Sequence, residues 1–231
     1  MSLCFKVLAV VIGLAVVADA AAADLSPATV PAPSPFSWDG LYLGLNAGYS
    51  GVSVTLTPSD GSGTGSSSIP GGIGGFQIGV NYQFGNVVAG FEADFDGSMA
   101  TKSFTAGTAS GNNQIPWIGT LRGRLGYAFD RYLFYVTAGG AATQLLSLVN
   151  VGALGSSNTS NTTGAWTAGG GFEAAITDNL SARIEYLYLD TGNITVAQVG
   201  ATPPPPTVTL IGRLQDNLIR AGLNYRFPVA W

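Results

Sequence analysis

The amino-acid sequence predicts an all-β fold, an eight-stranded antiparallel up-and-down transmembrane β-barrel, from three observations. Only 10% of the 231 residues are charged, whereas an ordinary soluble domain has about 25%. After the N-terminal apolar run, no segment has the ~18 unbroken apolar residues that a membrane helix needs. The dominant spacing of apolar residues is two, the period of a strand, rather than 3.6. A chain with these properties is expected to cross a membrane with strands.

The N-terminal residues predict a signal peptide, residues 1–23. Lys6 supplies a weak positive charge, and the apolar run Val7–Val17 that follows is too short to span a bilayer. Small residues come next, so we expect cleavage between Ala23 and Asp24. The alternative interpretation of the apolar run is a short buried helix.

A linker and one barrel domain account for the rest of the chain. Residues 24–37 are rich in Pro, Ala and Ser without periodicity, so we expect an extended linker. Residues 38–231 form the predicted barrel. Cys4 leaves with the signal peptide and the chain has no His. Catalytic Ser–His–Asp and Cys–His arrangements and the common zinc sites are therefore excluded, and we expect no enzyme and no cofactor.

Eight segments show the alternation of apolar and polar or small residues. They are residues 38–49, 74–84, 87–95, 115–129, 132–138, 164–176, 180–188 and 217–227. Their connections alternate in length. Tight turns, such as Gly85-Asn86 and Asp130-Arg131, follow the second, fourth and sixth segments. Long polar connections follow the others, at about 53–72, 100–113, 147–163 and 191–213. Short turns at one end and long loops at the other are typical of outer-membrane barrels. A soluble β-sandwich is not expected to show this alternation of short and long connections.

The apolar face of each strand is expected to point outward to lipid, because a closed sheet leaves no unpaired backbone in hydrocarbon. Aromatic residues should then gather in two girdles at the membrane interfaces. The girdle at the short-turn end comprises Phe84, Tyr127, Phe129, Tyr132, Tyr225 and Phe227. The girdle at the long-connection end comprises Tyr49, Phe76, Trp117, Trp166, Tyr186 and Tyr188, with Phe95 at the same level.

Nearly all charged residues within the strands fall on the inward face. They are Glu92, Asp94, Arg122, Arg124, Glu173, Arg183, Glu185, Arg220 and Arg226, with Asp96 as a further carboxylate toward the long connections. An eight-stranded barrel is just wide enough for side chains to fill. We therefore expect Arg–carboxylate pairs across the lumen, since unpaired buried charge is costly.

Two other functions for this lumen stay open at the level of sequence. The charges could form the selectivity ring of a narrow porin, because inward-facing glycines (Gly79, Gly126 and Gly222) could leave water-filled pockets. Glu92 and Asp94 could in principle perform acid–base chemistry on envelope lipid, although neighbouring arginines favour ionised structural partners. Gly-rich stretches such as "GGIGG" lack the helix and the GK[ST] signature of a phosphate loop.

Two stretches resemble a known family. "PFSWDGLYLGLNAGY", residues 35–49, resembles the opening strand of the alphaproteobacterial 25/31-kilodalton outer-membrane antigens, small OmpA- or opacity-like barrels that include RopB. "NLIRAGLNYRF", residues 217–227, resembles their closing strand. Chains of that family end near the aromatic residue of "YRF", but here "PVAW" follows, so either Phe227 or Trp231 could be the terminal signal for assembly.

The resemblance implies an outer-membrane location and roles in envelope integrity, surface exposure and host interaction. We accordingly expect a structural barrel that displays mobile polar loops, with a narrow porin for small solutes as the alternative. The expected partners are outer-membrane lipid and lipopolysaccharide, the barrel-assembly machinery, and a host or envelope component at the loops. The net charge of −4 argues against nucleic acid, and we expect a monomer.

Overall fold

The structure, a computed structural model, describes residues 36–59, 64–106, 109–151, 156–199 and 208–227. The predicted signal peptide, residues 24–35 of the predicted linker, and Trp231 lie outside these described residues. All described residues belong to one of the chain's two compact units, Pro35–Trp231. No helix in this described part is long and apolar enough to cross a membrane.

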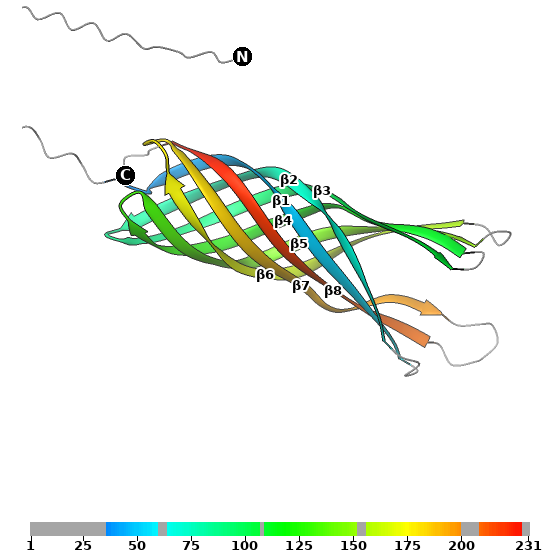
Figure 1. Ribbon diagram of the computed structural model, residues 1–231. Helices are drawn as coiled ribbons and strands as arrows, with labels where there is room; N and C mark the ends of the chain where they lie inside the picture. The colour runs from blue at the N-terminus through cyan, green and yellow to red at the C-terminus, as the bar shows by residue number, and fades with distance from the viewer. Residues whose placement is uncertain (1–35, 60–63, 107–108, 152–155, 200–207, 228–231) are drawn as a thin grey trace, which may run out of the picture. The chain divides into compact units, whose positions relative to one another are not determined.

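Eight antiparallel strands close into a barrel (Figure 1). They are β1 (Gly40–Pro58), β2 (Gly65–Phe84), β3 (Val87–Ala106), β4 (Ala109–Phe129), β5 (Tyr132–Val151), β6 (Ser156–Ala175), β7 (Leu180–Val199) and β8 (Val208–Phe227). Each strand pairs with its neighbours in the sequence, and β1 pairs with β8 from Leu41↔Phe227 onward. The predicted eight-stranded up-and-down barrel is confirmed, and its closure removes the sheet edges that hydrocarbon would not tolerate.

The tight turns lie where the sequence predicts them. Gly85-Asn86 joins β2 to β3, and Gly85 adopts a left-handed φ of +62°. Asp130-Arg131 joins β4 to β5, and Asp130 has a φ of +51°, which Asp tolerates better than most residues. In the third turn the hydroxyl of Thr177 accepts hydrogen bonds from the N–H groups of Asn179 and Leu180, at 3.3 and 3.0 Å.

The prediction of four long loops at the other end is wrong in its extent. Most of residues 53–72 belongs to a continuous β1–β2 hairpin, in which Val52 pairs with Ile69 and Thr55 with Ser66. The other three connections are likewise mostly strand. Val and Thr in the outer part of β1 favour a strand, and the Ser- and Gly-rich outer part of β2 pairs with them. The barrel therefore carries projecting hairpins rather than long irregular loops.

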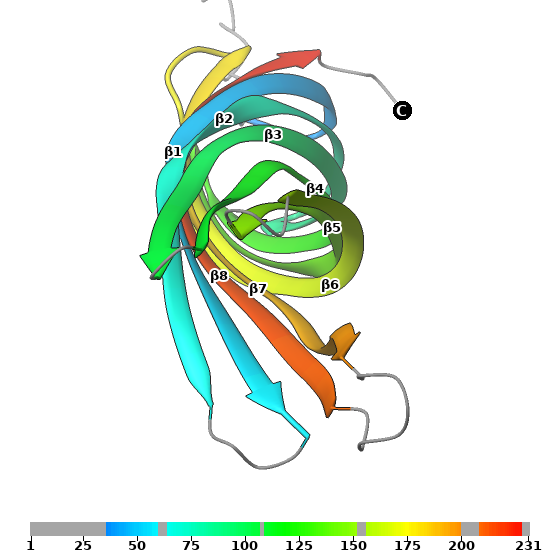
Figure 2. The same cartoon turned by 90° about the vertical axis from the view of Figure 1, so that its right-hand side faces the viewer.

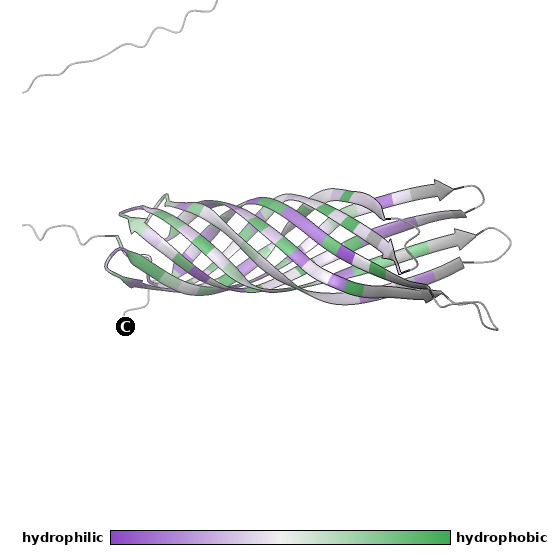
Figure 3. Cartoon of the chain, turned by 90° about the horizontal axis from the view of Figure 1, so that it is seen from below, coloured by the Kyte–Doolittle hydropathy of each residue, from purple (hydrophilic) through white to green (hydrophobic). Residues whose placement is uncertain are grey.

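Side chains alternate between the outside and the lumen as the period of two requires. On β4, Leu121 and Leu125 are 66% and 55% exposed, whereas Arg122 and Arg124 are 1% and 4% exposed. Figure 3 shows the same alternation of hydrophobic and hydrophilic residues along the strands. The charged residues of this segment lie inside, and its large apolar residues lie on the outer face of the barrel.

The lumen is filled in three layers. A turn-end cluster of apolar residues lies nearest the tight turns and comprises Trp38, Val88, Ala128, Leu133 and Tyr135. The charged side chains follow. A hairpin-end cluster then closes the other end and comprises Val52, Ile69, Ile73, Ala100, Ile115, Ile118, Leu187, Leu189, Leu214 and Leu218. The charged layer is thus enclosed between two apolar layers, which strengthens its electrostatic interactions.

Candidate functional site: the filled lumen

Arg122 of β4 is the centre of the charged layer. Its guanidinium lies 2.5 Å from Glu92 and 2.8 Å from Asp94, both on the neighbouring strand β3. It also reaches Glu185 of β7, on the far side of the lumen, at 3.0 Å. The Arg122 side chain is fully buried. One guanidinium therefore ties β3, β4 and β7 together, which matches the fork-like donor geometry of arginine.

Arg220 of β8 shares two of these carboxylates. It lies 2.9 Å from Asp94 and 2.8 Å from Glu185. It also pairs with Asp96 at 2.6 Å, and this places Asp96 within the network. Because both arginines contact Asp94 and Glu185, the two ion-pair groups are continuous across the barrel.

A second group of charges lies closer to the tight turns. Arg124 pairs with Glu173 of β6, and its guanidinium lies 3.8 Å from the centre of the Tyr135 ring. Glu173 also accepts hydrogen bonds from Ser181 at 2.5 Å and from Asn224 at 2.8 Å. These contacts satisfy the carboxylate from three strands, as a buried charge requires.

Arg183 connects the two groups. It pairs with Glu92 and lies 3.8 Å from Glu185. The hydroxyl of Tyr42 donates to Glu92 at 2.7 Å and itself accepts from Arg124 at 3.3 Å. Eight of the nine predicted lumen charges therefore meet in one charge network, and Asp96 joins them as its ninth member. Its members are Glu92, Asp94, Asp96, Arg122, Arg124, Glu173, Arg183, Glu185 and Arg220.

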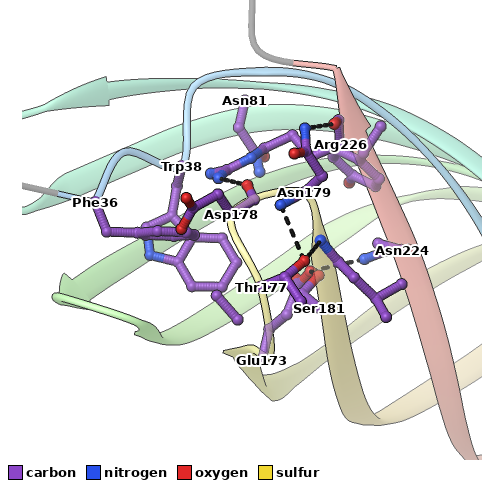
Figure 4. A pocket seen from close by; sticks show the side chains of 13 residues that line it. Phe36, Trp38, Asn81, Glu173, Thr177, Asp178, Asn179, Ser181, Asn224 and Arg226 are labelled. Carbon is purple, nitrogen blue, oxygen red and sulfur yellow. Dashed lines mark hydrogen bonds between the residues drawn. The ribbon is translucent and has the colours of Figure 1, made fainter.

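Arg226 is the exception, and its predicted membership of the network is corrected. Its guanidinium donates to the backbone carbonyls of Ser37 and Asp178 and lies 4.3 Å from the centre of the Phe36 ring. Figure 4 shows Arg226 beside Phe36 and Asp178 at this end of the barrel. Arg226 lies on the inward side but only one residue from the end of β8, so it reaches the rim rather than the charged layer.

The residues before β1 close the turn end of the barrel. Trp38 is only 2% exposed; its indole N–H donates to the Asp130 carbonyl at 3.1 Å. Its backbone N–H donates to the Gln83 side chain at 2.6 Å. The cavity beside Phe36 and Trp38 has a volume of about 10 Å³, room for about one water molecule. The alternation of residues predicts Trp38 only as the start of the barrel, and its burial in the turn-end cluster is visible in the structure alone.

The hairpin-end cluster was also missed. Leu187 and Leu189 are 1% exposed and alternate with the outward-facing Tyr186 and Tyr188. Since both faces of residues 186–189 are apolar, the alternation of apolar and polar residues is weak there. The sequence feature that could have revealed the cluster is Leu on the inward face of β7, which elsewhere carries charged residues.

The girdle residues lie on the outer face. Ten of the twelve have exposures between 42% and 63%. Trp117 and Tyr188 are less exposed, because Trp117 stacks on Phe95 at 5.7 Å between ring centres and Tyr188 packs against Trp166 at 5.4 Å. Rings with polar tips on an apolar outer surface suit the two membrane interfaces.

The inward-facing glycines do not leave open pockets in this lumen. A Cβ at Gly79 would overlap the Tyr42 ring, and one at Gly126 would lie 2.8 Å from the Leu133 side chain. One at Gly222 would lie 2.9 Å from the Leu45 carbonyl. Glycine occurs at these positions because neighbouring groups already fill the space. Among the described residues, no group of His, Cys, Asp or Glu is arranged to hold a metal ion.

Comparison with known proteins agrees with this architecture. Residues 10–227 match the model of the outer membrane protein beta-barrel domain. The chain is 36% identical to the 31 kDa outer-membrane immunogenic protein of Brucella melitensis, over 92% of this chain and 93% of the relative. It is 33% identical to the 25 kDa outer-membrane immunogenic protein of Brucella abortus, over 91% and 92%.

A solved structure shares the fold. The outer membrane protease OmpT from Escherichia coli superposes with a TM-score of 0.52 at 8% sequence identity, over 82% of this chain and 97% of that one. An identity this low shows the likeness of fold alone.

Proposed function

This chain belongs to the outer membrane protein β-barrel domain family and lies in the outer membrane, and from that premise we propose that it is a non-conducting barrel that strengthens the envelope and presents its hairpins at the cell surface. The observation that carries the proposal is the filled lumen. Arg122 and Arg220 are each 1% exposed, with an apolar layer on either side of them. A barrel filled in this way acts as a rigid anchor.

A mechanical role also suits the way the charge network connects the strands. Arg122 joins β3, β4 and β7, Arg220 joins β8 to β3 and β7, and Arg124 joins β4 to β6. Moving β3 or β4 away from β6, β7 or β8 would therefore separate buried charges, which is costly. Cross-lumen pairs of this kind resist deformation of the barrel within a membrane.

The carboxylates fit a structural role better than catalysis. Glu92 and Glu173 are 2% and 3% exposed and accept hydrogen bonds from arginines and from hydroxyl groups. A general acid or base must come within about 3 Å of its substrate, and the cavity that Glu173 lines beside Trp38, with a volume of about 10 Å³, is too small for a lipid group. We propose that the chain does not act as an enzyme on envelope lipid.

Contacts outside the barrel complete the proposal. The outward apolar residues and the girdles would contact lipid and lipopolysaccharide, and the projecting hairpins would contact a host or envelope component. We propose Phe227 as the terminal signal for the assembly machinery, because it is the last residue of β8 and pairs there with Leu41. Each barrel closes on itself, so we propose a monomer.

The function is tested in a strain that lacks this protein. We expect increased sensitivity to detergent, and the full chain supplied in trans should restore resistance. It should do so without raising the uptake of small hydrophilic solutes. Restored uptake without restored resistance would support the narrow porin and contradict the proposal. Unchanged sensitivity in the deletion strain would contradict the envelope role.

A further inference from the structure

The barrel wall is not continuous along its whole length. Pairing of β2 with β3 stops at Ile73↔Ser98, and pairing of β6 with β7 stops at Trp166↔Asp190. The ladders between the other neighbouring strands continue farther, so the outer ends separate into two groups, β7-β8-β1-β2 and β3-β4-β5-β6 (Figure 2). Four strand segments then have a paired neighbour on one side only among the described residues: 65–72, 99–106, 156–165 and 191–199.

The separation of β6 from β7 is built into the local sequence. Asp190 accepts from Arg213 of β8 at 2.5 Å and from the N–H of Gly192 at 2.8 Å. Gly192 has a left-handed φ of +64°, and the register between β7 and β8 shifts between Asp190 and Asn193. A bulge of this kind bends its strand. These contacts hold β7 to β8 at the level where β6 loses its β7 partner.

An unpaired strand edge can pair with a strand of another molecule, and proteins usually protect such edges with Pro, charged residues such as Lys, or bulges. Three of the four edges here are guarded. Residues 65–72 contain Pro70, residues 99–106 contain Lys102, and residues 191–199 contain two register shifts.

The edge of β6 has no such guard. Residues 156–165 contain no Pro and no charged residue, and their pairing with β5 runs from Asn150↔Ser156 to Ala141↔Ala165 without a register shift. The segment is about 30 Å long at the usual rise of a strand. It lies beyond Trp166 of the outer girdle, and its Asn158, Ser160, Asn161 and Thr162 side chains are exposed. It is a regular strand with one row of backbone donors and acceptors that has no paired strand among the residues that the structure describes.

We propose that residues 156–165 of β6 dock an extended, uncharged peptide segment of a partner protein, which adds to the sheet as an antiparallel strand. Backbone hydrogen bonds would supply the affinity, as in other cases of strand addition. The partner segment should be uncharged because the edge offers no charge to complement. The added strand would continue the pairing of β6 at the point where β7 leaves it. This inference rests on the proposed surface role and names the kind of partner.

A second copy of this chain fits the edge less well. Two barrels in one membrane, related by a two-fold axis along the membrane normal, would bring their β6 strands together in parallel. Antiparallel pairing would then be impossible, and parallel pairing is slightly less stable per residue. A flexible peptide has no such restriction.

The test uses the full chain reconstituted in phosphatidylcholine vesicles. The probe is a synthetic peptide with the sequence of residues 143–151, the antiparallel neighbour of β6 within the barrel, extended by lysines for solubility. Its matched control is the same peptide N-methylated at every second amide. We expect the probe to slow amide hydrogen exchange at alternate residues of 156–165 by about tenfold or more. Exchange at 65–72 should not change.

Two variants separate edge binding from adsorption. Lysines at exposed positions of β6 (Ser160→Lys with Thr162→Lys) should abolish the protection, whereas lysines on β2 (Ser66→Lys with Ser68→Lys) should leave it intact. Equal protection by the N-methylated peptide, equal protection at 65–72, or no protection at 156–165 would overturn the proposal. Protection without peptide that grows with protein density would identify a second copy as the occupant, and would also overturn it. Solute uptake is measured separately, so a conducting barrel that binds the probe would overturn only the proposed function.

Discussion

Replacing Arg124 by leucine tests whether the charges of the lumen depend on one another. Glu173 would lose its ion pair with the Arg124 guanidinium and would keep the hydrogen bonds from Ser181 and Asn224. Removing one partner of a buried ion pair costs about 3–5 kcal/mol. The stacking of Arg124 on Tyr135 would be lost as well. We expect a loss near the middle of that range, because the two remaining hydrogen bonds offset part of the cost.

The matched control is Arg131→Leu in the β4–β5 turn. Arg131 pairs with Asp178 at 2.7 Å, but the two side chains are 43% and 82% exposed. An exposed pair contributes about 0–1 kcal/mol. In a second variant, Arg124→Leu with Glu173→Gln, the uncompensated charge is removed, so part of the lost stability should return.

Stability is measured by urea titration of each protein folded into vesicles. The folded fraction is read from tryptophan fluorescence and from the different gel migration of unboiled and boiled samples. At about 1.4 kcal/mol for each factor of ten, a loss of about 4 kcal/mol in Arg124→Leu should lower the folding equilibrium constant by about 700-fold. Equal losses for Arg124→Leu and Arg131→Leu would refute the assignment of Arg124 to a buried, paired lumen site.

Three further predictions concern the outer face, the lumen glycines and the turn-end plug. Leu125→Arg, on the membrane-facing surface, should lower the free energy of unfolding by about 2–4 kcal/mol in the urea titration. Leu148→Arg, on the exposed part of a hairpin, should lower it much less, and equal losses would contradict the predicted membrane boundary. Gly79→Ala should cost about 1–3 kcal/mol because a Cβ has no room there. At Gly74 an added Cβ would lie 3.6 Å from its nearest neighbour, the Asn46 carbonyl oxygen, so alanine should be tolerated. Trp38→Ala should lower the free energy of unfolding by about 3–5 kcal/mol and lower the melting temperature in detergent, and Trp38→Phe should recover part of the loss. An unchanged melting temperature in Trp38→Ala would show that Trp38 does not plug the barrel.

The fold was predictable because hydrocarbon enforces a simple pattern. On β4 the alternation of Leu121 and Leu125 with Arg122 and Arg124 identifies both faces of the strand from sequence alone. A wrong register would put guanidinium groups in lipid, so selection keeps the pattern clear. Turn residues between the alternating segments, such as Gly85-Asn86 and Asp130-Arg131, gave the number of strands and the position of the tight turns.

The pattern weakens where the membrane no longer acts on both faces. Beyond the outer girdle both faces of a strand meet water, so residues such as Ser66 and Thr162 carry no period and their strands read as loops. Around Leu187 and Leu189 both faces of β7 are apolar, so alternation did not predict the apolar layer that these residues help to form in the lumen. Arg226 keeps the inward phase of its strand, but alternation does not reveal that it lies at the rim.

Single-channel recording of the full chain in a planar lipid bilayer tests the filled lumen most directly. The charge network and its two apolar layers predict no stable conductance steps above the leak of the bilayer without protein. The recorded protein must be shown to be folded by its gel migration before boiling. Stable, reproducible conductance steps from that folded protein would show an open path through the lumen and would contradict the account.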